Sequence, residues 1–140
     1  MKKWIVMCAI LGAAAQSYAE VGSWTKHTMH YPIYFSSDIA TMPFYASPPM
    51  LAGNSFVTSV SWNWTGYGNG NTSRLVHICY STKYSMALVG CQNISNSPQG
   101  SINAFNGIDA SSRFWIRQQI FGGSYPAMSY TSDSITVMYK

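Results

Sequence analysis

Charged residues are scarce in this chain of 140 residues: only 9% are Asp, Glu, Lys or Arg, and only four are acidic. Apart from an adjacent pair near the N-terminus, the Lys and Arg residues are scattered singly. Nucleic-acid binding depends on many phosphate contacts from clustered cations, and attachment to an acidic membrane surface needs a polybasic patch. We therefore expect neither a nucleic-acid partner nor an electrostatic membrane partner.

Groups that carry out catalysis are equally few. The internal acids Asp38, Asp109 and Asp133 each lie beside Ser, Ala or Ile in expected loops or strand ends, where Asp is ordinarily a turn or cap residue. No G-x-S-x-G elbow, dinucleotide-binding motif or phosphate-binding loop occurs in the sequence. The sequence predicts a protein that is not an enzyme, with no catalytic residue and no cofactor.

The histidines also lack the spacing of a metal site. His27, His30 and His77 are the three present. Residues three apart on a strand point to opposite faces of the sheet, so His27 and His30 would not chelate one ion together. We expect no metal site.

No apolar run reaches the roughly 20 residues that a membrane-spanning helix needs. The longest, residues 4–15, follows a Lys-Lys pair and ends in Ser17-Tyr18-Ala19. That order of basic, apolar and small residues is typical of a secretory signal peptide cleaved before Glu20. The sequence thus predicts a signal helix over residues 1–19, a single domain over residues 20–140 and no stable membrane anchor.

Cysteine is rare as well, with three residues, of which Cys8 lies in the predicted leader. Cys79 and Cys91 remain, and an even number in an exported chain favours a disulfide. If the two cysteines face each other across antiparallel strands, the residue numbers of every facing pair must add up to 170. The connection between the strands is then centred near Ser85. We expect this bridge to be structural.

What the chain does have is alternation. Beyond the leader, β-branched and aromatic residues alternate with Ser, Thr and Asn, and Gly, Pro and Asn clusters interrupt them; this is typical of β-strands joined by turns. In one strand the larger residues fall on a single face, which we expect to point inward: Phe56, Thr58, Val60, Trp62 and Trp64.

The remaining expected strands show the same pattern. Thr41–Pro49, with its three prolines, is expected to be irregular. About seven short strands predict an all-β fold, a small antiparallel β-sandwich or barrel. The other strands are expected at Trp24–Phe35 (a loose edge strand), Arg74–Tyr80, Leu88–Ile94, Ser101–Ile108, Arg113–Phe121 and Ser134–Lys140.

Aromatic residues make up 15% of the chain. Exposed Trp and Tyr side chains bind carbohydrates and anchor protein interfaces. Trp62 and Trp115 are expected in the core, whereas Trp64 precedes a glycine-rich turn and is expected to be exposed. The candidate binding residues are those expected at an edge, beside a turn or near a hairpin tip: Trp24, Trp64, Tyr84 and Met86.

Several short stretches share an order along the chain with a known family. They are Gly22-Ser23-Trp24, Val60-Ser61-Trp62, Arg74 to Cys79, Phe105-Asn106-Gly107-Ile108, Arg113-Phe114-Trp115, Gly122-Gly123 followed by Pro126-Ala127, and Ile135 to Lys140. In this order they resemble the FlhE family of small periplasmic flagellar proteins. Two regions depart from the family pattern: the cysteines are separated by an inserted stretch, Tyr80–Gly90, and Lys26–Pro49 matches poorly.

The resemblance implies a periplasmic, non-enzymatic accessory of flagellar assembly, with flagellar rod or export-gate proteins as partners. The family's two roles are chaperoning rod or later subunits and limiting proton leakage through the export gate. An open sheet edge, from the C-terminal strand or the Trp24 segment, is expected to pair with an extended client. The alternatives are a secreted carbohydrate- or protein-binding β-sandwich module and a small hydrolase of unfamiliar geometry.

Overall fold

The computed structural model describes residues 21–46 and 54–140. The predicted signal helix, its cleavage site and the end of the Thr41–Pro49 segment lie outside these residues. Eight strands are present in the described ranges: β1 (Gly22–Met29), β2 (Ile39–Phe44), β3 (Val57–Asn63), β4 (Ser73–Ser81), β5 (Gly90–Asn93), β6 (Gln99–Ile102), β7 (Arg113–Phe121) and β8 (Ser132–Tyr139).

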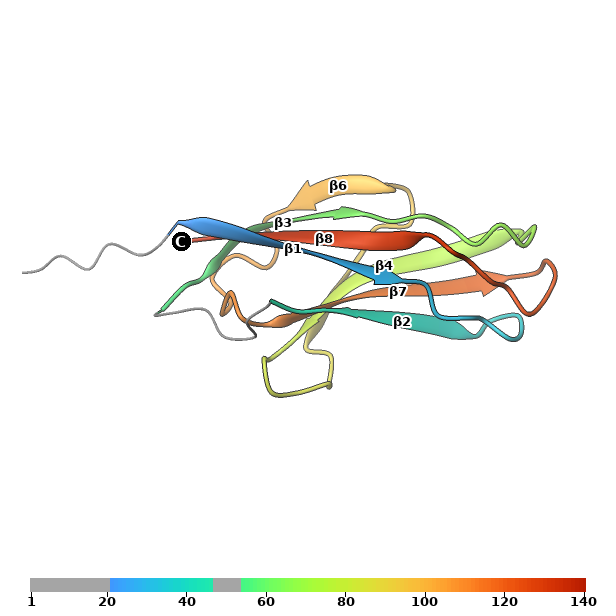
Figure 1. Ribbon diagram of the computed structural model, residues 1–140, viewed down its shortest axis with the longest axis horizontal. Helices are drawn as coiled ribbons and strands as arrows, with labels where there is room; N and C mark the ends of the chain where they lie inside the picture. The colour runs from blue at the N-terminus through green and yellow to red at the C-terminus, as the bar shows by residue number, and fades with distance from the viewer. Residues whose placement is uncertain (1–20, 47–53) are drawn as a thin grey trace, which may run out of the picture.

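The strands form two four-stranded antiparallel sheets that pack face to face as a β-sandwich (Figure 1). The first sheet has the order β1-β8-β3-β6, and the second has the order β2-β7-β4-β5. The predicted all-β fold is therefore confirmed, with the sandwich as the form it takes.

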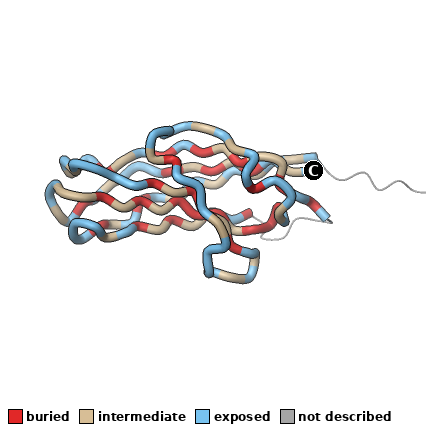
Figure 2. The backbone as a smooth tube through the Cα atoms, turned by 180° about the vertical axis from the view of Figure 1, so that it is seen from behind, coloured by how far each residue is buried: buried red, intermediate tan, exposed pale blue. Residues whose placement is uncertain are grey.

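Alternation along the strands builds the core. In the first sheet, Trp24, Val137, Val60 and Ile102 are aligned across all four strands and point inward. In the second sheet the inward positions of β7 alternate with outward ones, and Figure 2 shows buried residues along strands of both sheets. Burial of these apolar side chains supplies the main stabilisation of the sandwich.

The strand predictions with strong alternation are confirmed. β7 has the predicted limits, and the β4–β5 hairpin has the predicted register, from His77 opposite Asn93 to Tyr80 opposite Gly90. Trp62 is buried as expected, but Phe56 is 47% exposed. The register shifts between Val57 and Ser59, and this irregularity turns Val57 inward in place of Phe56.

Two expectations about edges are wrong. Thr41–Pro49 was expected to be irregular, yet β2 includes Pro43 and buries Met42 and Phe44 against the core. An edge strand pairs on one side only, so a proline is tolerated where its missing N–H would face away from the sheet. The C-terminal strand is not an open edge either, because β8 pairs with both β1 and β3, whereas β1, which contains Trp24, is an edge strand of the first sheet as expected.

Candidate functional site

The outer face of the second sheet carries large side chains. Alternation in β7 places Phe114 and Ile116 inward and Arg113, Trp115 and Arg117 outward. Trp115 lies opposite Cys79 of β4 on one side and opposite Pro43 of β2 on the other. Its indole Nε1 donates a hydrogen bond to Ser81 Oγ at 3.0 Å, and only 5% of the residue is exposed.

A disulfide holds the loop that stands beside this face. Cys79 and Cys91 are bonded in adjacent positions of β4 and β5, as predicted. The connecting segment, residues 82–89, projects away from the sheet (Figures 1 and 2). Its base is closed by a hydrogen bond from Val89 N to Tyr80 O at 2.8 Å. The bridge therefore fixes both ends of an exposed loop.

Between this loop and β2 lies a groove of about 530 Å³, here called the outer groove. Trp115 and Pro43 form its apolar floor, and Arg113 and Arg117 line it from β7. Four large side chains that are at least one third exposed form its rim: Tyr31, Tyr45, Met86 and Leu88. Exposed apolar surface gathered around a hollow is typical of binding sites.

The outer groove is electropositive. Neither arginine lies within 4.0 Å of a carboxylate among the described residues, and no acidic residue lines the groove. Arg113 stacks over the Tyr45 ring, with its guanidinium carbon 6.0 Å from the ring centre. A second hollow, which shares Tyr31 and Tyr45 with the groove, is lined by Lys26. The Lys and Arg side chains that line these two hollows, Lys26, Arg113 and Arg117, are therefore not balanced by any acidic lining residue.

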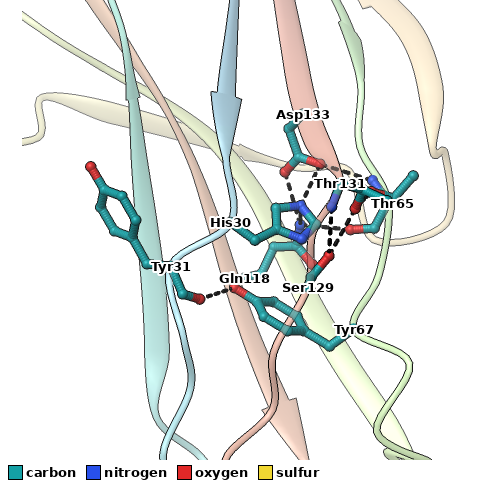
Figure 3. Close-up of polar contacts among 8 residues, drawn as sticks. All are labelled: His30, Tyr31, Thr65, Tyr67, Gln118, Ser129, Thr131 and Asp133. Carbon is teal, nitrogen blue, oxygen red and sulfur yellow. Dashed lines mark hydrogen bonds and ion pairs between the residues drawn. The ribbon is translucent and has the colours of Figure 1, made fainter.

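A polar cluster lies inside the sandwich (Figure 3). Asp133 Oδ1 accepts hydrogen bonds from His30 Nε2 at 2.7 Å and from Thr65 N at 2.9 Å, while Oδ2 accepts one from Gln118 Nε2 at 2.9 Å. Gln118 Nε2 also lies 3.3 Å from His30 Nε2. Gln118 Nε2 also donates to Thr65 O at 2.9 Å.

This cluster links the two sheets. Asp133 belongs to β8, Gln118 to β7, and His30 follows β1. Asp38 and Asp109 do accept local backbone hydrogen bonds, as turn residues should, but Asp133 is fully buried, so its assignment as a turn or cap residue is wrong. The His30 and Asp133 side chains are fully buried, which gives a substrate no access and makes this a structural network.

Tyr67 connects the cluster to the outer groove. Its ring stacks on His30 at 5.0 Å, and its hydroxyl donates to Tyr31 O at 2.5 Å. Burial, followed by the negative charges of Asp133 and Asp38, raises the pKa of Tyr67 well above its usual range, so the hydroxyl remains a donor. Figure 3 shows the Tyr31 side chain pointing away from the cluster. The buried Tyr67 therefore fixes, through this hydrogen bond, the main chain of Tyr31, which is a residue of the groove rim.

Two tryptophans proposed for binding serve the interior instead. The expectation that Trp64 is exposed is wrong: it is 4% exposed and donates from Nε1 to Ser97 O at 3.0 Å. The inward alternation of β3 continues one residue beyond the strand and carries Trp64 into the core. Trp24 is half-buried, packs on Phe114 at 6.1 Å between ring centres and donates to Ala110 O.

The other two candidates are exposed, Tyr84 by 76% and Met86 by 71%. The structure brings only Met86 into the outer groove. The arginines of β7 were not singled out from the sequence, although their alternation with Trp115 was a usable signal. Tyr45 was missed because its segment was expected to be irregular.

Within residues 21–46 and 54–140, no group of three His, Cys, Asp or Glu side chains is arranged to hold a metal ion. The same ranges contain no helix with the length and apolarity needed to cross a membrane.

No family model and no curated protein matches the sequence. Among solved structures, the fold is similar to the crystal structure of FlhE, with a TM-score of 0.68 and 19% sequence identity. The match covers 87% of this chain and 99% of the FlhE chain. The resemblance noted in the sequence therefore extends to three dimensions: this chain has the FlhE fold.

Proposed function

We propose that this chain is a non-enzymatic accessory protein of flagellar assembly that acts in the periplasm. The observation that carries the proposal is the structural match to FlhE, which extends over 99% of the FlhE chain. The ordered sequence stretches add support, because five of the seven fall in strands of the shared fold, namely β1, β3, β4, β7 and β8.

The proposed compartment has support of its own. The Cys79–Cys91 disulfide is of a kind that persists in oxidising compartments and is rare in the cytosol. The basic, apolar and small residues of positions 1–19 have the order of a secretory leader. Together they favour export, and the FlhE fold favours the periplasm as its destination.

Within flagellar assembly, we propose a chaperone role toward a rod or export component. The outer groove supports it, because a hollow rimmed by exposed apolar side chains suits a segment of another protein. A carbohydrate-binding module has less support: Trp62 and Trp64 are buried in the core, so neither offers a sugar an open stacking surface.

The test is deletion of the gene in its host, scored for swimming, proton leakage and flagella misplaced in the periplasm. We expect a defect in at least one of these, restored by the full chain but not by a chain that begins at Glu20 and remains in the cytoplasm. Normal behaviour in all three assays would overturn the flagellar role. Rescue by the leaderless chain would overturn the periplasmic site of action.

A further inference from the structure

The two arginines of the outer groove lack an acidic partner within the described residues, although Arg113 stacks on Tyr45. Lys83, on the neighbouring loop, forms an ion pair with Asp109 at 3.2 Å. Arg113 and Arg117, in contrast, have no carboxylate within 4.0 Å in the part of the chain that is described. Arginine forms paired, charge-assisted hydrogen bonds with carboxylates, so an acidic occupant would complete the groove.

The spacing of these arginines specifies the shape of that occupant. Arg113, Trp115 and Arg117 are alternate residues on one face of β7. Four residues of strand separate the Cα atoms of the two arginines by about 13 Å. An extended peptide has the same rise, so acidic residues four apart would reach both guanidinium groups. The residue midway between them would lie over the Trp115 floor.

The rim favours an apolar residue at that midway position. Met86 and Leu88 on one side and Tyr45 on the other present aliphatic and aromatic surface. A sugar-phosphate or a lipid headgroup would satisfy the arginines but would leave this surface uncovered. An apolar side chain between two carboxylates covers the surface and pairs both charges.

The occupant cannot form main-chain hydrogen bonds with β2 at Pro43, on the floor of the groove. Pro43 has no N–H, and its carbonyl already accepts a hydrogen bond from Thr28 Oγ1 at 2.6 Å. We therefore expect side chains to supply most of the affinity at this groove.

We propose that the outer groove binds an extended segment of a partner protein in which one apolar residue lies midway between two acidic residues four positions apart. If the proposed function holds, this segment belongs to the flagellar client. Arg113 and Arg117 bind its carboxylates, and Trp115, Met86 and Leu88 contact its apolar side chain.

The probe is a fluorescein-labelled peptide, Gly-Glu-Thr-Leu-Thr-Glu-Gly, titrated with the purified exported protein and followed by anisotropy. Two control peptides replace both Glu residues with Lys or the Leu with Ser. We expect the first peptide to bind at least about tenfold more tightly than either control, and its affinity to fall as salt is added. Equal binding of all three peptides would overturn the proposal.

The protein variants are matched in charge. Arg113→Gln with Arg117→Gln removes two positive charges from the groove, and Thr25→Glu with Ser61→Glu adds two negative charges on the opposite face of the sandwich. We expect only the first pair to weaken binding of the acidic peptide, by about tenfold or more. Circular dichroism and the thermal midpoint verify that both variants fold. If both pairs of substitutions weakened peptide binding equally, the effect would come from the net charge of the protein, and the proposed site would be overturned.

Other occupants are measured in parallel. If the protein bound phosphatidylglycerol vesicles through the arginines but did not bind the peptide, the occupant of the groove would be a lipid surface and the peptide proposal would be overturned. If the protein self-associated and the Gln variant did not, the occupant would be a second copy of this chain. Complementation then separates the two proposals. Peptide binding without any flagellar defect on deletion overturns the proposed function alone, whereas a flagellar defect without peptide binding overturns the groove proposal alone.

Discussion

The two outer faces of the sandwich are built by the same alternation but carry different chemistry. On the first sheet, Thr25, Thr136, Ser61 and Ser101 form a row across all four strands, and the Thr25 and Thr136 hydroxyl oxygens are 2.7 Å apart. The corresponding row on the second sheet is Pro43, Trp115, Cys79 and Cys91, with Arg113 and Arg117 on either side of Trp115.

The difference shows how a recognition surface arises without a change of fold. Small hydroxyl side chains can pair with one another or with water, so the first face needs no partner. On the second face Trp115 itself is buried, but Pro43, Arg113 and Arg117 beside it are partly exposed, and the disulfide-bound loop encloses them in a groove. Changes at the groove should therefore affect binding, whereas changes at the hydroxyl face should affect neither binding nor folding strongly.

The largest effect should come from the interior that both faces share. Asp133→Ala leaves three buried donors without their acceptor, on His30, Thr65 and Gln118. We expect the free energy of unfolding to fall by about 3 kcal/mol or more, measured by urea denaturation. Asp133→Asn, which preserves volume and one acceptor, should lose less. If Ala and Asn variants both lost under about 1 kcal/mol, the cluster would not be what joins the sheets.

The next effect distinguishes the faces directly. Replacing Cys79 and Cys91 with Ala opens a loop whose ends are 12 residues apart, and we expect a loss of about 3 kcal/mol in the free energy of unfolding. Affinity for the acidic peptide should fall as well, because the disulfide no longer fixes the ends of the loop that carries Met86 and Leu88. Reduction of the unmodified protein by dithiothreitol is the matched control and should reproduce both changes. If the peptide affinity did not change, the loop would have no part in binding the peptide.

A smaller effect tests the link between the interior and the groove rim. Tyr67→Phe removes the hydrogen bond to Tyr31 O and should lower the free energy of unfolding by about 1 kcal/mol at neutral pH. A modest loss of peptide affinity should accompany it, because the backbone of Tyr31 is less well held.

The pH dependence of that variant has a defined sign. The folded state raises the pKa of Tyr67 above the value of about 10 that it has when unfolded. The unfolded chain therefore loses this proton first, and the stabilisation present below pH about 10 declines as the pH rises further. Urea titrations between neutral and alkaline pH should show the difference between wild type and Tyr67→Phe shrinking above that point. A difference that grew with pH would contradict the assignment.

Strong alternation and a single pairing constraint were enough to predict much of the fold. The limits of β7 follow from its sequence, and the numbering rule for Cys79 and Cys91 gives the register of the β4–β5 hairpin. Pro43 concealed β2, because a proline disfavours a strand unless an edge is available, and the edge exists only in the assembled sheet.

The candidate site was less predictable because its parts are distant in the sequence. Asp133 contacts His30 and Thr65, which precede it by 103 and 68 residues, and nothing local distinguishes it from a turn residue. Gln118 between the apolar positions of β7 was the one local sign of a buried polar partner. The groove likewise needs Tyr45, Met86 and Arg117 brought together from three segments.

The smallest expected effect is the most exacting check of the comparison. Thr25→Val with Thr136→Val removes the hydroxyl pair from the first face while keeping β-branched side chains of the same shape. The lost hydrogen bond is exposed, and Val favours strands at least as well as Thr, so the free energy of unfolding should change by about 0.5 kcal/mol or less. Peptide affinity should remain within about twofold of wild type. If this variant lost as much peptide affinity as the Arg113→Gln, Arg117→Gln variant, the hydroxyl face would also take part in recognition. The conclusion that only the second face binds a partner would then be wrong.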